Sequence, residues 1–161
     1  MPGPPIIVWL RHDLRLADNA ALDAAVQTGR PVVPFFLWAP EEEGAWPMGA
    51  ACRTWLHTSL SQLKDAFEAL GSRLILREGT AAESLKTLAE DTGASAIYWN
   101  RRYESAAVAR DQKVKESLRS QDIEAKSFNG SLLFEPWEIE TQQGGPYKVF
   151  TPFWRACQGK D

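Results

Sequence analysis

Short, continuous apolar runs recur along most of this chain and are separated by amphipathic segments. The runs IIVWL (6–10), VVPFFLW (32–38) and AIYWN (96–100) have the pattern of strands that are buried on both faces. The segments SRLILRE (72–78) and IEAKSF (123–128) predict two further strands. The pattern therefore predicts five strands.

Helical patterns lie between these strands. Apolar residues recur at helical spacing from Cys52 to Leu70, which predicts a long amphipathic helix closed by Gly71. Capping residues predict three more helices: one from a cap at Asn19 through Thr28, one from a capping box at Thr80 and Glu83 to Gly93, and one from a cap at Ser105 to about Gln121.

Regular alternation of five strands with four helices predicts the fold class. Each crossover between parallel strands returns right-handed across the sheet, so helices cover both of its faces. We expect an α/β fold, with a doubly wound five-stranded parallel sheet that is Rossmann-like and has the strand order 3-2-1-4-5. The segment 131–161 leaves this rhythm. It carries many large apolar residues without clear periodicity, which is typical of a segment that packs on another surface.

Composition limits the function classes. The 161 residues carry a net charge of −3, whereas a surface that binds nucleic acid by itself needs clustered positive charge. Cys52 and Cys157 lack metal-ligand spacing and fit a reducing compartment, so we expect a cytoplasmic location and no metal site. The apolar run at 6–10 is too short to span a membrane, so no membrane partner is expected.

A charged stretch, RHDLR (11–15), follows the first predicted strand directly. In open α/β sheets, ligands bind at the carboxyl ends of the strands, where the strand order reverses. The loops at 11–19 and 100–104 are therefore expected to form the walls of a crevice. An internal ion-pair network that braces the loop is an equally weighted alternative for four residues: Arg11, Asp13, Arg15 and Asp18.

Other features limit the chemistry of this crevice. Trp38 stands at the end of a predicted strand, where a flat ring can stack on a planar heterocycle or be buried in the core. The acidic run at 41–43 is expected to be a solvated loop. The sequence has no GxGxxG or GxxxxGK[ST] motif and no arrangement typical of nucleophilic catalysis, so we predict no catalytic residue.

Four motifs occur in the order in which one known family has them. They are IVWLRHDLRLADNAAL, FFLWAPEEEG, SFNGSLLFEPWEI and YKVFTPFWRAC. Together they resemble the DNA photolyase and cryptochrome family of flavin photoreceptors, and are especially similar to plant cryptochromes and class III cyclobutane pyrimidine dimer photolyases. The resemblance covers essentially the whole chain.

The resemblance implies a two-domain protein. Residues 1–130 are expected to be the amino-terminal α/β antenna domain and 131–161 the start of the interdomain connection. The helical domain that binds FAD and damaged DNA is expected to lie outside this sequence. The implied function is light harvesting in a deoxyribodipyrimidine photolyase, a carbon–carbon lyase that repairs UV-induced pyrimidine dimers with blue light. This chain is not expected to be catalytic alone. A cryptochrome blue-light receptor without repair activity and a nucleotide-binding α/β module are the alternatives.

The resemblance also implies an antenna chromophore, which is methenyltetrahydrofolate, deazaflavin or FMN. Ala106 and Ala107 stand where folate-type bacterial photolyases have an Asn-Glu pair, so that form of the folate site is not expected. The loops that line the crevice supply the candidate chromophore-binding residues: Arg11, His12, Trp38, Glu43, Arg102 and Glu104. Surface or interdomain salt bridges are the alternative role for the charged residues among them.

Overall fold

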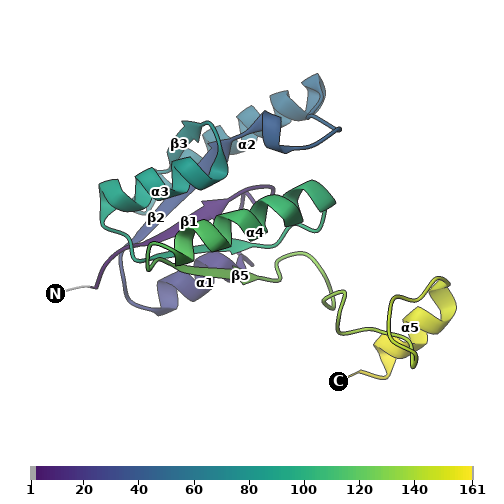
Figure 1. Ribbon diagram of the computed structural model, residues 1–161. Coiled ribbons are helices and arrows are strands. Elements are labelled where there is room, and N and C mark those ends of the chain that lie inside the picture. The colour runs from purple at the N-terminus through teal and green to yellow at the C-terminus, as the bar shows by residue number, and fades with distance from the viewer. Residues whose placement is uncertain (1–2, 161) are drawn as a thin grey trace. The chain divides into compact units, whose positions relative to one another are not determined.

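A parallel sheet of five strands organises the amino-terminal part of the protein (Figure 1). The computed structural model describes residues 3–160, which divide into two compact units between Gly130 and Ser131. The elements of the first unit are β1 (Ile6–Leu10), α1 (Ala20–Gln27), β2 (Val32–Trp38), the 3₁₀ helix η1 (Pro40–Glu42), α2 (Ala50–Ala69), β3 (Ile75–Glu78), α3 (Ala81–Thr92), β4 (Ala96–Asn100), α4 (Ser105–Arg119) and β5 (Glu124–Phe128). The strands lie in the order β3-β2-β1-β4-β5 and all pair in parallel, so the predicted fold class is confirmed.

Helices cover both faces of the sheet. On one face, α3 and α4 bury a cluster that contains Trp9, Phe35 and Trp99. On the other face, α1 and α2 bury a cluster that contains Val8 and Phe36. Because successive residues of a strand point to opposite faces, strands covered on both sides need apolar residues at every position. This is why β1, β2 and β4 are continuous apolar runs in the sequence.

The strand order reverses between β1 and β4. β1 pairs with β2 on one side, from Ile6↔Val32 to Leu10↔Phe36, and with β4 on the other side. The chain moves outward from β1 to β3 and then returns to β4. The loops that follow β1 and β4 therefore leave the same edge of the sheet side by side, at the position where ligands bind in such folds.

Two strands begin later than predicted. β3 begins at Ile75 rather than at residue 72, because the backbone N–H of Ser72 still donates to the carbonyl of Phe67 in α2. Gly71, with a φ of 75°, adopts the left-handed conformation that this turn needs. β5 begins at Glu124 instead of residue 123.

The predicted helix caps have different outcomes. Asn19 caps α1 as predicted, because its side-chain oxygen accepts from the N–H of Leu22 at 3.2 Å. Thr80 stands at the N-cap of α3, but its side chain makes no capping hydrogen bond, so the predicted capping box is wrong. Ser105 is the first residue of α4 and not its cap, which is Glu104.

The amphipathic stripe predicted for α2 is buried only in part. Its fully buried side chains are Leu63 and Phe67, which both lie in the second half of the helix. Cys52 and Trp55, near its start, are exposed, and 77% of the surface of Trp55 is accessible. The first half of α2 therefore does not serve the core in the way that its periodicity predicts.

The second unit, residues 131–160, contains a helix that the sequence pattern did not reveal. This helix, α5 (Phe150–Gln158), buries Cys157, while Phe150 and Trp154 stack on its surface with ring centroids 6.3 Å apart. These exposed aromatic rings belong to the segment that was predicted, from its irregular apolar pattern, to pack on another surface. Within residues 3–160, no helix has the length and apolar character needed to cross a membrane.

Candidate functional site

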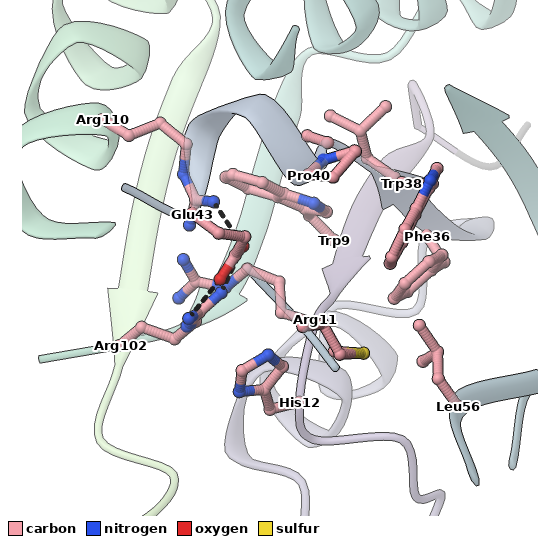
Figure 2. Close-up of a pocket in the computed structure, with 13 residues that line it drawn as sticks. Trp9, Arg11, His12, Phe36, Trp38, Pro40, Glu43, Leu56, Arg102 and Arg110 are labelled. Atoms are coloured by element: carbon pink, nitrogen blue, oxygen red, sulfur yellow. Dashed lines mark hydrogen bonds and ion pairs between the residues drawn. The ribbon is translucent and has the colours of Figure 1, made fainter. Parts of the chain in front are cut away.

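The loops after β1, β2 and β4 enclose a narrow cavity of about 40 Å³ at the carboxyl edge of the sheet, which we call the slot (Figure 2). Predicted residues that line it are Arg11, His12, Trp38, Glu43 and Arg102. Glu104 does not line the slot but pairs with Arg102 at 3.1 Å. The remaining lining residues are Trp9, Phe36, Leu37, Ala39, Pro40, Met48, Leu56 and Arg110.

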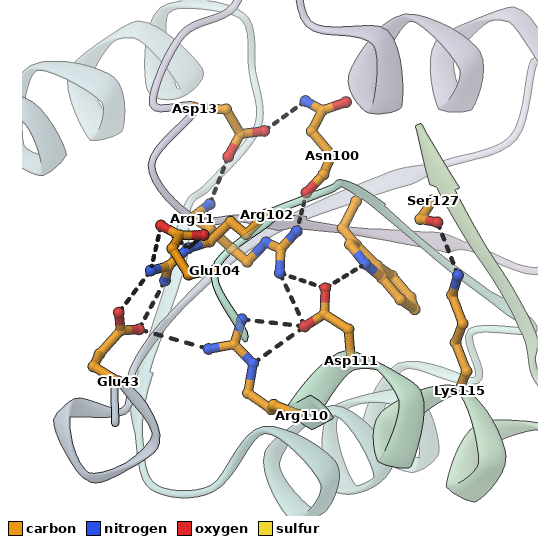
Figure 3. A network of polar contacts seen from close by, with 11 residues as sticks. Arg11, Asp13, Glu43, Asn100, Arg102, Glu104, Arg110, Asp111, Lys115 and Ser127 are labelled. Carbon is orange, nitrogen blue, oxygen red and sulfur yellow. Dashed lines mark hydrogen bonds and ion pairs between the residues drawn. The ribbon is translucent and has the colours of Figure 1, made fainter. Parts of the chain in front are cut away.

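Arg11, the first residue after β1, is buried at the slot with 4% of its surface exposed. Its Nη1 donates to both carboxylate oxygens of Asp111, at 2.7 and 3.0 Å, and its Nη2 donates to the carbonyl of Asn100 (Figure 3). Its buried Nε has no hydrogen-bond partner in the described part of the chain. Burial lowers the pKa of Arg11 from its ordinary value, and the charge of Asp111 opposes that shift.

Asp111 also holds a second guanidinium group. Arg110 donates to its Oδ1 from Nε and Nη2, at 3.2 and 3.1 Å. The indole N–H of Trp99 donates to its Oδ2 at 3.1 Å. Asp111 is absent from the residues predicted from sequence, although it shares the buried face of α4 with Val114 and Leu118. A single carboxylate on an otherwise apolar helix face is the signal that could have identified it.

Trp9 forms an apolar wall beside these charges. The guanidinium carbons of Arg11 and Arg110 lie 4.9 and 5.0 Å from the centroid of its ring. Trp99 packs against it edge-to-face, with the ring centroids 5.8 Å apart. Cation–π contacts and edge-to-face packing both favour one orientation of the ring, so this wall of the slot is held in place.

Glu43 closes the slot from the β2–α2 loop, residues 39–49. Its carboxylate oxygens accept from Nη1 and Nη2 of Arg102 at 2.8 and 2.7 Å, and Nη1 of Arg110 lies 3.6 Å away. The hydrogen bonds from Arg102 are the main cause that lowers the pKa of Glu43. Burial disfavours the charged form of Arg102 and so tends to lower its pKa. The hydrogen bonds that Arg102 donates to Glu43 and Glu104 outweigh this effect and raise the pKa of Arg102.

The acidic run at 41–43 is not the solvated loop that was predicted. The N–H of Ala81 donates to both carboxylate oxygens of Glu42, at 3.1 and 3.2 Å, so Glu42 caps α3 in place of Thr80. Glu41 is the exposed member of the run. The prediction is wrong because Glu42 and Glu43 each meet a donor from a distant element, which a local pattern does not reveal.

Opposite charges balance around the slot. Three guanidinium groups face three carboxylates: Arg11, Arg102 and Arg110 against Glu43, Glu104 and Asp111. Partial burial, followed by the positive charge of Arg102, lowers the pKa of His12, which favours its neutral form. The slot is therefore rich in hydrogen-bonding groups, and its guanidinium groups are paired with carboxylates.

The internal network predicted as the alternative role of the β1–α1 loop is present as well. Asp13 accepts from the backbone N–H of Arg11 at 2.7 Å and from the side chain of Asn100 at 2.6 Å. Asn100 also donates to Asn19 at 2.8 Å. The loop is therefore fixed to the end of β4 by these hydrogen bonds, while the binding role expected of its charged residues stays a prediction.

Arg15 and Asp18 take little part in the slot. Arg15 donates to the carbonyl of Gly130 at 3.0 Å, at the end of the first unit. Its ion pair with Asp18 is exposed and 3.7 Å long, so it contributes little to stability.

A larger cavity of about 580 Å³ adjoins the slot, and we call it the groove. The groove and the slot share four lining residues: Arg11, His12, Met48 and Leu56. The groove is completed by Leu14, Arg15, Ala51, Cys52, Trp55 and Ser59. The sequence pattern missed this wall, because it assigned the first half of α2 to the core.

The groove and the slot combine aromatic side chains with fixed hydrogen-bonding groups. Residues 3–160 contain no cluster of His, Cys, Asp or Glu side chains that could hold a metal ion. Aromatic rings beside fixed donors and acceptors suit a planar heterocycle with a polar edge.

Comparisons with known proteins agree with this arrangement. A family model for DNA photolyase matches residues 6–160. The chain is 47% identical over 157 residues to a deoxyribodipyrimidine photo-lyase of Agrobacterium fabrum and 45% identical over 152 residues to cryptochrome-1 of Arabidopsis thaliana. These alignments cover 98% and 94% of this chain but only 32% and 22% of the relatives.

A solved structure matches over the full length of the chain. It is a bacterial class III photolyase from Agrobacterium tumefaciens, which superposes with a TM-score of 0.91 at 45% identity and covers 100% of this chain. This chain covers 33% of that protein, so it spans about a third of the photolyases that it matches. The resemblance predicted from the four motifs is confirmed, and the chain belongs to the DNA photolyase family.

Proposed function

We propose that this chain is the amino-terminal light-harvesting domain of a deoxyribodipyrimidine photolyase, and that it holds an antenna chromophore in the groove and the slot. Members of the family bind FAD and an antenna chromophore. The observation that carries the proposal is a groove of about 580 Å³ beside a rigid, charge-balanced polar slot.

Size assigns different parts of the ligand to the two cavities. Ligand pockets usually have volumes of about 300–1,000 Å³. The groove lies in that range, whereas the slot, at about 40 Å³, is far too small for a whole ring. A planar chromophore would lie in the groove against Trp55 and direct its polar edge toward Arg11 and His12. The other candidates, Trp38, Glu43, Arg102 and Glu104, would form or support the far wall of the slot.

Charge balance favours some ligands over others. A nucleotide gains most of its affinity from contacts to phosphate, which need net positive charge or a glycine-rich turn at a helix N-terminus. The charged groups around the slot pair with one another, and the sequence has no glycine-rich phosphate motif, which disfavours the alternative of a nucleotide-binding module. Among residues 3–160, the groove is lined by Arg11 and Arg15 and by no carboxylate, so each of the three chromophores remains a candidate.

An antenna needs rigidity more than reactivity. The chromophore would absorb blue light and pass the excitation energy to a flavin. The residues of this chain would bind it, fix its orientation and limit its contact with water. The fixed ring of Trp9 and the paired side chains of Arg11 and Asp111 suit that task.

Titration of the chain with methenyltetrahydrofolate, a deazaflavin, FMN and ATP, followed by absorbance and fluorescence, tests the proposal. We expect micromolar binding of a chromophore and little binding of ATP. Trp55→Ala should weaken chromophore binding by about tenfold, since stacking on an aromatic ring is worth on the order of 1–3 kcal/mol. Trp46→Ala is the matched control, because Trp46 is 90% exposed and does not line the groove. Micromolar ATP binding without chromophore binding would overturn the proposal.

The activity of the whole protein is a separate part of the proposal. The partner of this chain would be the carboxy-terminal FAD-binding domain, through which the protein would bind damaged DNA. Thymine-dimer repair by the full-length gene product under blue light tests this part. Absence of repair despite bound, photoreducible FAD would favour a signalling cryptochrome, the alternative that the identity to cryptochrome-1 supports.

A cytoplasmic location also belongs to the proposal. Cys52 is exposed and Cys157 is buried, and both thiols are free. Unpaired cysteines are typical of proteins from a reducing compartment.

A further inference from the structure

The slot is smaller than the ligand edge that its polar groups suit. Its volume of about 40 Å³ leaves room for little more than a water molecule. The β2–α2 loop forms one of its walls, through Ala39, Pro40, Glu43 and Met48. The edge of a ring can therefore enter the slot only if this loop moves.

We propose that the β2–α2 loop is a strap that controls entry of the ligand into the slot, and that the ion pair between Glu43 and Arg102 is its latch. The inference rests on the proposed chromophore site and adds a control of its kinetics. It assigns a role to Glu43 that differs from contact with the ligand.

The strap is attached at two further points away from the slot. Glu42 accepts the N–H of Ala81 at the start of α3. Gly44, with a φ of 72°, lies so close to α4 that a Cβ atom added to it would be 3.1 Å from Cβ of Ala106. These contacts hold the back of the strap, whereas the pair between Glu43 and Arg102 closes its front, at the slot.

Geometry explains why the latch can open. Arg102 closes the latch with two hydrogen bonds, one to each carboxylate oxygen of Glu43, at 2.8 and 2.7 Å. The side chains of Arg102 and Glu43 keep 12% and 21% of their surfaces exposed. Water can therefore solvate both groups as they separate, and opening does not leave a charge in a dry interior.

Stopped-flow binding of methenyltetrahydrofolate to the chain tests the latch. Glu43→Gln keeps the shape of the side chain but removes its charge. If Glu43 is a latch that must open before the ligand enters, this variant should raise the association rate by about fivefold and lower Kd by a similar factor, with little change in the dissociation rate. If Glu43 contacts the ligand instead, only the dissociation rate should rise, and that result would overturn the inference. Equal rates in the variant and the wild type would also overturn it.

Glu41→Gln is the matched control, because it removes the same charge from the exposed neighbouring position. Its binding rates should equal those of the wild type, and a similar acceleration in this variant would assign the effect to net charge and refute the latch.

Hydrogen exchange without ligand gives an independent measurement. The amides of Glu42 and Glu43, which donate to Ala39 and Pro40, should exchange faster in Glu43→Gln but not in Glu41→Gln. Unchanged exchange would refute the strap. Failure of the wild type to bind any chromophore would count against the proposed function, and the exchange result would still decide whether the latch exists.

Discussion

Arg11 and Asp111 are a hundred positions apart in the sequence, yet Nη1 of Arg11 lies 2.7 Å from Oδ2 of Asp111 in the interior of the first unit. This pair joins the end of the central strand β1 to the middle of α4. It also sets the positions of Arg11 and Arg110 at the slot, because both guanidinium groups share the one carboxylate.

Removal of the Asp111 carboxylate should destabilise the protein strongly. Asp111→Asn leaves the buried guanidinium of Arg11 without its counter-charge, which typically costs about 3–5 kcal/mol. The free energy of unfolding from urea titration measures the effect. Glu116→Gln, at an exposed position of the same helix, should change stability by less than about 0.5 kcal/mol. An equally small effect of Asp111→Asn would contradict the structural importance of the pair.

Sequence patterns predicted the sheet because its strands are buried on both faces. Runs such as IIVWL have no polar position, and Gly29 and Gly93 end α1 and α3 with left-handed backbones that local chemistry alone requires. These features depend on neighbours in the sequence. The sequence therefore predicts the fold class and most boundaries of the strands and helices.

The parts that sequence did not predict depend on distant partners. Glu42 replaces Thr80 as the cap of α3 because the β2–α2 loop folds back onto that helix. Trp55 has the periodicity of a core residue, but 77% of its surface is exposed and it belongs to neither buried cluster of residues 3–160. The six predicted site residues came from loops at the strand ends, which the topology brings together. Asp111 lies within a helix, where its only signal is the apolar face that it shares.

Gly130 should tolerate no side chain. A Cβ atom at this position would lie 2.7 Å from Cγ and 2.8 Å from Cβ of Asn100. The side chain of Asn100 cannot move aside easily, because it donates to Asp13 and Asn19 and accepts from the N–H of Ala21.

Gly130→Ala should therefore lower the free energy of unfolding by about 1–3 kcal/mol, the usual cost of overpacking. Gly3→Ala is the control, since a Cβ atom there would lie 3.5 Å from Cγ of Arg30, which is an ordinary van der Waals distance. Gly130→Ala with the stability of the wild type would show that the end of the first unit is more mobile than this contact implies.

Glu42 and Thr80 allow a direct test of which side chain caps α3. Glu42→Ala removes the only side-chain acceptor that the described structure gives to the N–H of Ala81, and loss of such a cap costs about 1 kcal/mol. Thr80→Ala should cost less, because its hydroxyl makes no capping bond. Urea unfolding of both variants, with Glu41→Ala as the control for charge, measures the order. A larger loss in Thr80→Ala would restore the capping box that the sequence pattern predicts.

His12 should make stability depend on pH near neutrality. Partial burial and the charge of Arg102 lower its pKa in the folded state, while Glu43 and Glu104 oppose the shift and Arg11 adds to it. A histidine with a lowered pKa binds protons more readily when unfolded. Its contribution to stability is therefore complete above the ordinary pKa of about 6.5 and is lost as pH falls through the folded value.

The free energy of unfolding, measured between pH 7.5 and 5, should fall less in His12→Gln than in the wild type. An equal fall in His12→Gln and in the wild type would show that His12 does not cause this pH dependence.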